Sequence, residues 1–270
     1  MNVMTHAGAR PAKAAGKREL RLIALAGVPL VREGDDLYET ILSAVARSGE
    51  QLASGDVLVL AQKIVSKARG CHVDLDTVTP SPRALELSRV VAKDPRVIEL
   101  ILRESSEVLR ARHDVIVVVH RLGFVMANAG IDFSNVEGNA RETRALLLPR
   151  DPDGECKQLR DALRLRAAVD VGVIINDSHG RAWRNGTVGV AIGASGVPAL
   201  LDLRGKPDLF GRALRITQVG LADELAAAAS LLMGQSDEGA PIVLIRGLPG
   251  GARDGCAAEL IRPKEMDLFR

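Results

Sequence analysis

The sequence predicts an α+β fold in two parts, with helices packed on mixed and antiparallel sheets. Its predicted strands and helices follow one another without the regular βαβ period of a parallel sheet. Hydrophobic residues make up 47% of the 270 residues and aromatic residues only 2%, so the expected core of Val, Leu, Ile and Ala suits strands packed on helices. No Walker A or GxGxxG sequence follows a predicted strand, which argues against P-loop and Rossmann folds.

The first half of the chain alternates apolar runs with amphipathic segments. Asp35 or Asp36 is a suitable N-cap for the first helix, and Asp94 followed by Pro95 marks the start of another. The predicted elements are a strand at 22–31 that ends at Gly27 or Pro29, a helix at 33–49, a strand that runs into a basic loop at 57–70, an irregular segment at 74–83 and a helix at 94–110.

The second half has the same mixture and ends on a helix and a strand. The predicted elements are a hairpin at 114–130 that turns at His120–Gly123, a helix at 155–168, a buried strand at 168–177, a Gly-rich strand or strand pair at 184–196, a helix at 219–234 with Gly234 as C-cap, and a strand at 241–247. We predict a disordered tail at 1–19, a main domain at 20–250 with an internal boundary near 149–154, and a C-terminal extension at 251–270.

Composition excludes several classes of protein. The net charge of +2 and the scarcity of aromatic residues argue against a nucleic-acid partner. No run of about 18 apolar residues is present, so no membrane-spanning helix is expected. Cys71, Cys156 and Cys256 form no close pair, which argues against a disulfide framework and fits a reducing compartment. We therefore expect a cytoplasmic protein.

Oxygen ligands follow the ends of predicted strands. Asp132 comes after the predicted hairpin, and Asp177 with Ser178 ends the strand at 168–177. Strand ends hold oxygen atoms rigidly and the adjoining loops leave room for phosphate, so Mg²⁺ or Mn²⁺ is commonly held at such places. Each aspartate taken alone is also explained as a solvated turn residue or a helix cap.

Basic groups occur in separate segments. Lys63 and Lys67 in "QKIVSK" can meet phosphate oxygens, and Arg181 and Arg184 lie in the polar segment "NDSHGRAWRNG". The loop "QSDEG" at 235–239 offers further oxygen ligands. The alternatives are solvated charges for the lysines and surface loops for the other two segments. The glycines of "GTVGVAIGASG" indicate close packing in a strand, because they match no dinucleotide fingerprint.

Together these segments resemble a known family, the coenzyme F420:L-glutamate ligases, also called F420-0:gamma-glutamyl ligases. The resemblance runs from about residue 22 to 247 and rests on ordered pieces. These are "GVPLVREGDDL", "GDVLVLAQKIVSKARG", "NAGIDFSN", "DPDGECKQLR", "GVIINDSHGRAWRNGTVGVAIGASG" and "GKPDLFGRALRITQVGLADELAAAASLLMGQSDEGAPIVLIRG".

The resemblance implies a homodimeric enzyme of unusual α+β fold. It implies that GTP is a co-substrate, that two Mg²⁺ or Mn²⁺ ions take part, and that K⁺ is a further candidate cation. The implied reaction joins the amine of L-glutamate to a carboxylate of the deazaflavin precursor F420-0 through an acyl phosphate, and then adds gamma-linked glutamates. No catalytic proton-transfer residue is nominated.

The resemblance also implies roles for individual residues. The implied nucleotide contacts are Val28, Pro29, Leu30, Val31, Gln62, Lys67 and Asn135. The implied metal ligands are Asp132, Asp177, Ser178 and Gln235.

Three positions depart from the pattern of the family. Gln62 stands where Ser is frequent, Ser178 where Thr is usual, and His179 where Phe or Met is common. Some relatives carry a fused C-terminal reductase-like domain that has no counterpart here, so ligase chemistry alone is expected. Two other hypotheses stay open: a ligase of the same fold that acts on a different carboxylic acid, and a nucleotide-binding protein without turnover.

Overall fold

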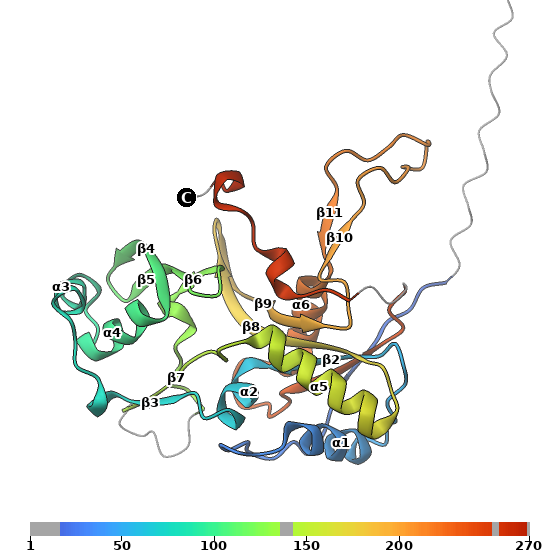
Figure 1. Ribbon diagram of the computed structural model, residues 1–270, viewed down its shortest axis with the longest axis horizontal. Coiled ribbons are helices and arrows are strands. Elements are labelled where there is room, and N and C mark those ends of the chain that lie inside the picture. Colours follow the sequence, from blue (N-terminus) through green and yellow to red (C-terminus); the bar gives the residue numbers. More distant parts are fainter. Residues whose placement is uncertain (1–16, 136–142, 250–253, 269–270) are drawn as a thin grey trace, which may run out of the picture.

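A five-stranded sheet is the centre of the structure, a computed structural model that describes residues 17–135, 143–249 and 254–268 (Figure 1). Its neighbouring strands β2 and β8 run parallel, and the other three neighbouring pairs run antiparallel. In spatial order the strands are β1 (Arg21–Ala24), β12 (Ile242–Arg246), β2 (Val57–Ala61), β8 (Gly172–Arg181) and β9 (Arg184–Ser195). The predicted α+β class with mixed sheets is confirmed.

Helices cover both faces of this sheet because alternate strand residues point to opposite sides. Leu58 and Leu60 of β2 pack in the cluster that contains the apolar faces of three helices, α1 (Leu37–Arg47), α2 (Gln62–Ala68) and α5 (Pro152–Ala167). Val57 and Val59 pack instead against α6 (Leu221–Met233). The strands of the centre are therefore buried on both faces, as their continuous apolar sequences require.

A second group of elements has its own apolar cluster, formed around Ile98, Ile101, Ile116 and Val118. It consists of α3 (Pro82–Val91), α4 (Pro95–Arg103) and the antiparallel strands β4 (Ser105–Arg112), β5 (Val115–His120) and β6 (Val125–Ala127). Figure 1 shows this group, drawn in green, beside the main sheet.

Two small ladders and four 3₁₀ helices complete the described elements. One ladder pairs β3 (His72–Asp74) with β7 (Arg144–Leu146), and the other pairs β10 (Leu200–Asp202) with β11 (Gln218–Gly220). The 3₁₀ helices are Leu75–Thr77, Asn128–Gly130, Ala257–Leu260 and Lys264–Met266. No helix in the described ranges combines the length and the apolar character needed to cross a membrane.

Several elements confirm the predictions from the sequence. Asp36 caps α1 by accepting a hydrogen bond from the backbone N of Tyr38 at 2.8 Å, and Gly234 is the C-cap of α6. The hairpin β5–β6, the strands β9 and β12 and the helix α5 also form where apolar patterning placed them.

Other predictions were wrong. The helix predicted at 94–110 ends at Arg103, because residues from Ser105 onward pair with β5 as strand β4. The basic loop predicted after β2 is the short helix α2, whose Ile64 and Val65 are buried. Strand β1 stops at Ala24, a few residues before the predicted end at Gly27 or Pro29; Gly27 takes a left-handed φ of 69° and Pro29 has no N–H to pair.

The segment 74–83, which was predicted to be irregular, contains the start of α3 at Pro82. Ser81 accepts a hydrogen bond from the backbone N of Ala84 at 3.2 Å, and Pro82 occupies the first turn. This is a sequence signal for a helix start. Most of the tail predicted at 1–19, and parts of the extension predicted at 251–270, lie outside the described residues. The boundary near 149–154 stays a prediction.

Gly189 of β9 provides a test of the packing between the sheet and α6. A Cβ added at Gly189 would lie 2.4 Å from Ser230 Oγ and 2.6 Å from both Ala226 O and Asn176 Oδ1, whereas a Cβ at Gly180 of β8 would meet nothing within 4 Å. We expect Gly189→Ala to lower the free energy of unfolding by about 1–3 kcal/mol. Urea unfolding with Gly180→Ala as control measures this, and equal effects of the two changes would contradict it.

Candidate functional site

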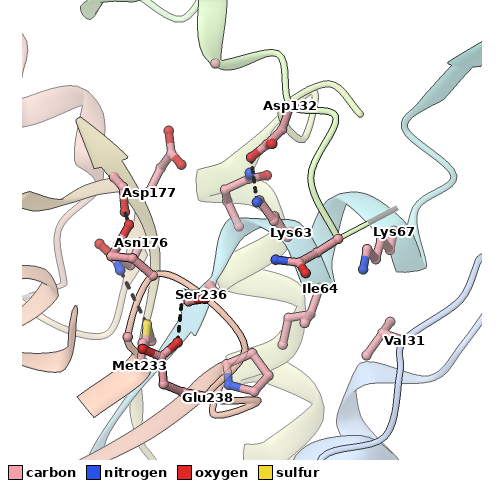
Figure 2. A pocket seen from close by; sticks show the side chains of 18 of the residues that line it. Val31, Lys63, Ile64, Lys67, Asp132, Asn176, Asp177, Met233, Ser236 and Glu238 are labelled. Atoms are coloured by element: carbon pink, nitrogen blue, oxygen red, sulfur yellow. Dashed lines mark hydrogen bonds and ion pairs between the residues drawn. The ribbon is translucent and has the colours of Figure 1, made fainter. Parts of the chain in front are cut away.

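A large cavity of about 1140 Å³ lies beside the end of β2 and the middle of β8 (Figure 2). Segments from both parts of the fold line it. They are 28–33, 61–64 with Lys67, His72, 126–128 and 130–132 with Asn135, Arg144, 176–180 with Thr187, and 233–241. Every residue to which the sequence analysis gave a nucleotide or metal role lines this one cavity. Their roles stay predictions.

The parallel pairing of β2 with β8 produces this arrangement. The pairing ends where Ala61 lies opposite Asn176, and the two strands then diverge in structure. After Ala61 the chain turns into α2, while β8 continues to Arg181 paired only with β9. Asp177 and Ser178 therefore lie beyond the C-terminal end of β2. The carboxyl ends of parallel strands are where α/β sheets commonly bind ligands.

Asp132 is held by an ion pair with Lys63. Lys63 Nζ lies 2.7 Å from Asp132 Oδ2 and donates a hydrogen bond to Ser134 Oγ at 2.7 Å. Ser134 in turn donates to Asp132 Oδ1 from Oγ at 2.8 Å and from its backbone N at 3.0 Å. Burial raises the pKa of the Asp132 carboxyl, but Lys63 and Ser134 outweigh burial, so the net shift of the pKa is downward. Asp132 is thus a carboxylate at neutral pH.

A second set of oxygen atoms lies along β8 and the loop after α6. Ser178 Oγ donates a hydrogen bond to Gln235 Oε1 at 2.8 Å, which joins two of the predicted metal ligands. His179 Nε2 lies 3.1 Å from Asp177 Oδ2, but off the direction of a hydrogen bond, so Nε2 has no hydrogen-bond partner among the described residues. Figure 2 shows Asp177 and Asp132 on different walls of the cavity.

The predicted nucleotide contacts come from three walls. Val28, Pro29, Leu30 and Val31 lie in a segment without regular secondary structure that follows β1. Gln62 is almost completely buried, and its Oε1 accepts a hydrogen bond from Ser66 Oγ at 2.9 Å. Asn135 has a left-handed φ of 57°, which Asn tolerates better than most residues. Lys67 lies one helical turn after Lys63, so both lysines are on the same face of α2.

The chemistry of the donor set fits a hard cation. Asp132, Asp177, Ser178 and Gln235 offer carboxylate, hydroxyl and amide oxygen atoms, which Mg²⁺ and Mn²⁺ prefer over nitrogen and sulfur. Within the described ranges, no three His, Cys, Asp or Glu side chains gather closely enough to hold an ion by themselves. A cation here would take its other ligands from phosphate and water, which is how Mg²⁺ is usually bound beside nucleotides.

The backbone before Asp132 explains the small residues of "NAGIDFSN". Asn128, Ala129 and Gly130 have φ values of 53°, 52° and 65°. A Cβ at Gly130 would lie 2.7 Å from Met126 Cε and 2.9 Å from Leu148 Cδ1. Glycine is therefore favoured here by the left-handed conformation, and a Cβ at this position would force Met126 or Leu148 to move.

Sequence reasoning missed several cavity residues, among them His72 and Arg144. These two are distant in the chain, and only the pairing of β3 with β7 brings them to one wall. No local motif signals that pairing. Conversely, Arg181 and Arg184 face each other at the far end of the β8–β9 hairpin, outside the cavity lining, next to the exposed Trp183. The end of that segment is therefore an exposed hairpin turn, whereas its residues 176–180 belong to β8 and line the cavity.

Comparison with known proteins gives consistent matches over most of the chain. The sequence model of a family described as "F420-0:Gamma-glutamyl ligase" matches residues 27–247. A protein of Methanothermobacter thermautotrophicus named "Coenzyme F420:L-glutamate ligase" is 49% identical over 253 residues, which cover 93% of this chain and 99% of that protein. Proteins of the same name from Methanopyrus kandleri and Methanocaldococcus jannaschii are 50% and 40% identical, over 90% and 94% of this chain and 96% and 98% of their own lengths.

The Lys63–Asp132 ion pair predicts a pH dependence. Because the pKa of Asp132 is lowered by folding, its ion pair stabilises the fold above the unfolded-state pKa of about 3.9, and this contribution is lost as the pH falls through the folded-state pKa. We expect Lys63→Met to raise the pKa of Asp132, measured by ¹³C-carboxyl NMR in metal-free buffer. Lys157→Met, which removes the exposed partner of Asp161, should leave Asp132 unchanged. An unaltered Asp132 pKa in Lys63→Met would contradict the assignment.

Proposed function

Because the chain belongs to the F420-0:gamma-glutamyl ligase family, we propose that it joins L-glutamate to the deazaflavin precursor F420-0 and then adds further gamma-linked glutamates, with GTP as co-substrate. The family match over residues 27–247 carries this proposal. Its support from the structure is that the family's nucleotide and metal positions, scattered from Val28 to Gln235 in the sequence, line one cavity.

The reaction needs activation of the acceptor, because a carboxylate does not condense with an amine at neutral pH. In the proposed reaction, the acceptor carboxylate attacks the terminal phosphoryl group of GTP, which forms an acyl phosphate and releases GDP. The amine of glutamate then attacks the acyl carbon, the carbon–oxygen bond to phosphate breaks, and the amine loses a proton as the amide forms. Holding the reactants in line is the main task of such a site.

The lysines of α2 are suited to the phosphoryl transfer. Lys63 lines the cavity with its Nζ 2.7 Å from the Asp132 carboxylate, so phosphate oxygens bound beside Asp132 would lie within reach of this ammonium group. Lys67 is on the same face of the helix and lines the same cavity. Two ammonium groups neutralise charge that spreads over the transferred phosphoryl oxygens.

We assign the oxygen atoms of Asp132, Asp177, Ser178 and Gln235 to Mg²⁺ or Mn²⁺, with K⁺ as a further candidate cation. When bound, such cations polarise phosphoryl oxygens and offset their charge. The 2.8 Å hydrogen bond from Ser178 to Gln235 holds two of these oxygens together. Ser178 keeps the hydroxyl of the Thr that is usual in the family, so its donor chemistry is preserved.

A homodimer is also part of the proposal, and the hairpin β10–β11 is its candidate contact. In Figure 1 this hairpin and the segment between its strands project away from the body of the molecule. Leu209, Phe210 and Ile216 in that segment are 90%, 84% and 88% exposed. We call this hairpin with its connecting segment the arm. Three large apolar side chains that are so exposed on the arm are typical of a surface that packs against another chain.

Asp177 provides the first test of the function. We expect Asp177→Asn to lower glutamate-dependent GDP release by about 10²–10³-fold, since it removes charge from the phosphoryl-transfer centre. The assay contains GTP, Mg²⁺ or Mn²⁺, L-glutamate and F420-0, and quantifies GDP and glutamylated product. Asp161→Asn, on the exposed side of α5, is the matched control and should keep full activity.

The same assay separates the alternatives. One GDP for each amide formed supports the proposal, and undiminished turnover by Asp177→Asn overturns the role of Asp177. GDP release only with another acceptor acid indicates a ligase with a different substrate. Tight GTP binding without any hydrolysis indicates a nucleotide-binding protein.

The arm provides a second test. We expect Phe210→Asp to shift the protein from dimer to monomer in sedimentation-velocity measurements, because a buried charge opposes apolar contact. Leu165→Asp is the matched control, since Leu165 on α5 is equally exposed at 86%. A dimer unaffected by Phe210→Asp, or a monomeric parent protein, would rule out the arm as the contact.

A further inference from the structure

His72 and Arg144 stand side by side on a wall of the cavity to which the proposed reaction has given no role. In the antiparallel ladder of β3 and β7, His72 lies opposite Leu146 and Arg144 lies opposite Asp74. Residues 72 and 144 are therefore diagonal neighbours with side chains on the same face, at a typical spacing of about 7–8 Å. Both line the cavity.

The other edge of β7 carries Asp132. The backbone N of Asp132 donates to Leu146 O at 3.0 Å, and the N of Leu146 donates to Asp132 O at 2.8 Å, so these two residues form a further antiparallel bridge. Arg144 is thus a diagonal neighbour of Asp132 as well as of His72, again about 7–8 Å away by ladder geometry. Backbone hydrogen bonds alone set the spacing between the proposed reaction centre and the His72–Arg144 pair.

Cationic side chains lie near His72. Burial lowers the pKa of the His72 imidazole, and the charges of Arg144 and Lys67 lower it further, against the opposing effect of Glu33. His72 is therefore neutral at pH 7. Its Nδ1 is buried without a hydrogen-bond partner among the described residues, which favours the tautomer that carries the hydrogen on Nε2. The ring then supplies one hydrogen-bond donor beside the guanidinium of Arg144.

We propose that Arg144 and His72 bind the side-chain carboxylate of the incoming glutamate, an inference that rests on the proposed ligase function. A guanidinium group matches a carboxylate with two parallel hydrogen bonds, and His72 Nε2–H adds a third donor. The arrangement favours an acidic amino acid, because a guanidinium group binds a carboxylate more strongly than it binds a neutral amide.

The length of the glutamate side chain decides which of its carboxylates extends farther from the amine. The side-chain carboxyl carbon lies four bonds from the amine nitrogen, roughly 5 Å in an extended conformer, whereas the α-carboxyl carbon lies only two bonds away, roughly 2.5 Å. With the amine directed to the acyl carbon near Asp132, the side-chain carboxylate is the group that reaches Arg144. Phosphate oxygens of the nucleotide stay with α2 and with the oxygen ligands on the far wall.

The test measures steady-state constants for Arg144→Gln. We expect KM for L-glutamate to rise about 10- to 100-fold, as for the loss of hydrogen bonds to a charged group, with KM for GTP changed less than about twofold. The preference for L-glutamate over L-glutamine should shrink by a similar factor, and Arg144→Lys should restore part of it. Arg112→Gln, on strand β4 away from the cavity, is the matched control.

A calorimetric titration of L-glutamate and L-glutamine into the same variants separates this inference from the proposed function. Glutamate binding that is weakened in Arg144→Gln supports the subsite even if the parent protein forms no amide, in which case the ligase function alone fails. A rise in KM for GTP with unchanged glutamate binding would assign these residues to nucleotide phosphate and overturn the inference. Unchanged binding of both ligands would overturn it too.

Discussion

The parallel pairing of β2 with β8 is the constraint on which the rest of the site depends. It is the one parallel contact in the five-stranded sheet, and it ends at Ala61 and Asn176. Because β8 then continues alone with β9 while the chain after β2 becomes α2, the two lysines of α2 face the oxygens of Asp177 and Ser178 across a cavity. The apolar side chains that bury β2 on both faces hold this geometry in place.

Charged side chains of both signs line the cavity. They include the acidic Glu33, Asp177, Asp237 and Glu238 and the basic Arg32, Lys67 and Arg144. Lys63 and Asp132, which also line it, form an ion pair. Such a cavity suits ligands that carry several negative charges together with cations, since each group finds a complementary wall. A triphosphate, a dicarboxylic amino acid and a divalent metal ion meet this description.

The small ladder of β3, β7 and Asp132 has a greater role than its length indicates. The three residues of β7 pair on one side with β3, which follows α2. On the other side, Leu146 of β7 pairs with Asp132. Backbone hydrogen bonds of this kind place side chains at fixed spacings, which a flexible loop does not achieve. Asp132, Arg144 and His72 are in this way held on adjacent strands of one ladder.

The sequence by itself determined the fold class and the helices with clear caps, and it nominated residues that line one cavity. Asp36 and Gly234 mark helix ends by chemistry that acts within one turn, and the resemblance to a family nominated Asp132, Asp177 and Lys67 at once. Only the tertiary structure decided that Ser105–Arg112 is a strand, that Lys63 pairs with Asp132, and that Arg144 reaches the cavity beside His72. The physical reason is range: caps and periodicity act over a few neighbouring residues, whereas strand pairing and ion pairs join segments that only the folded chain brings together.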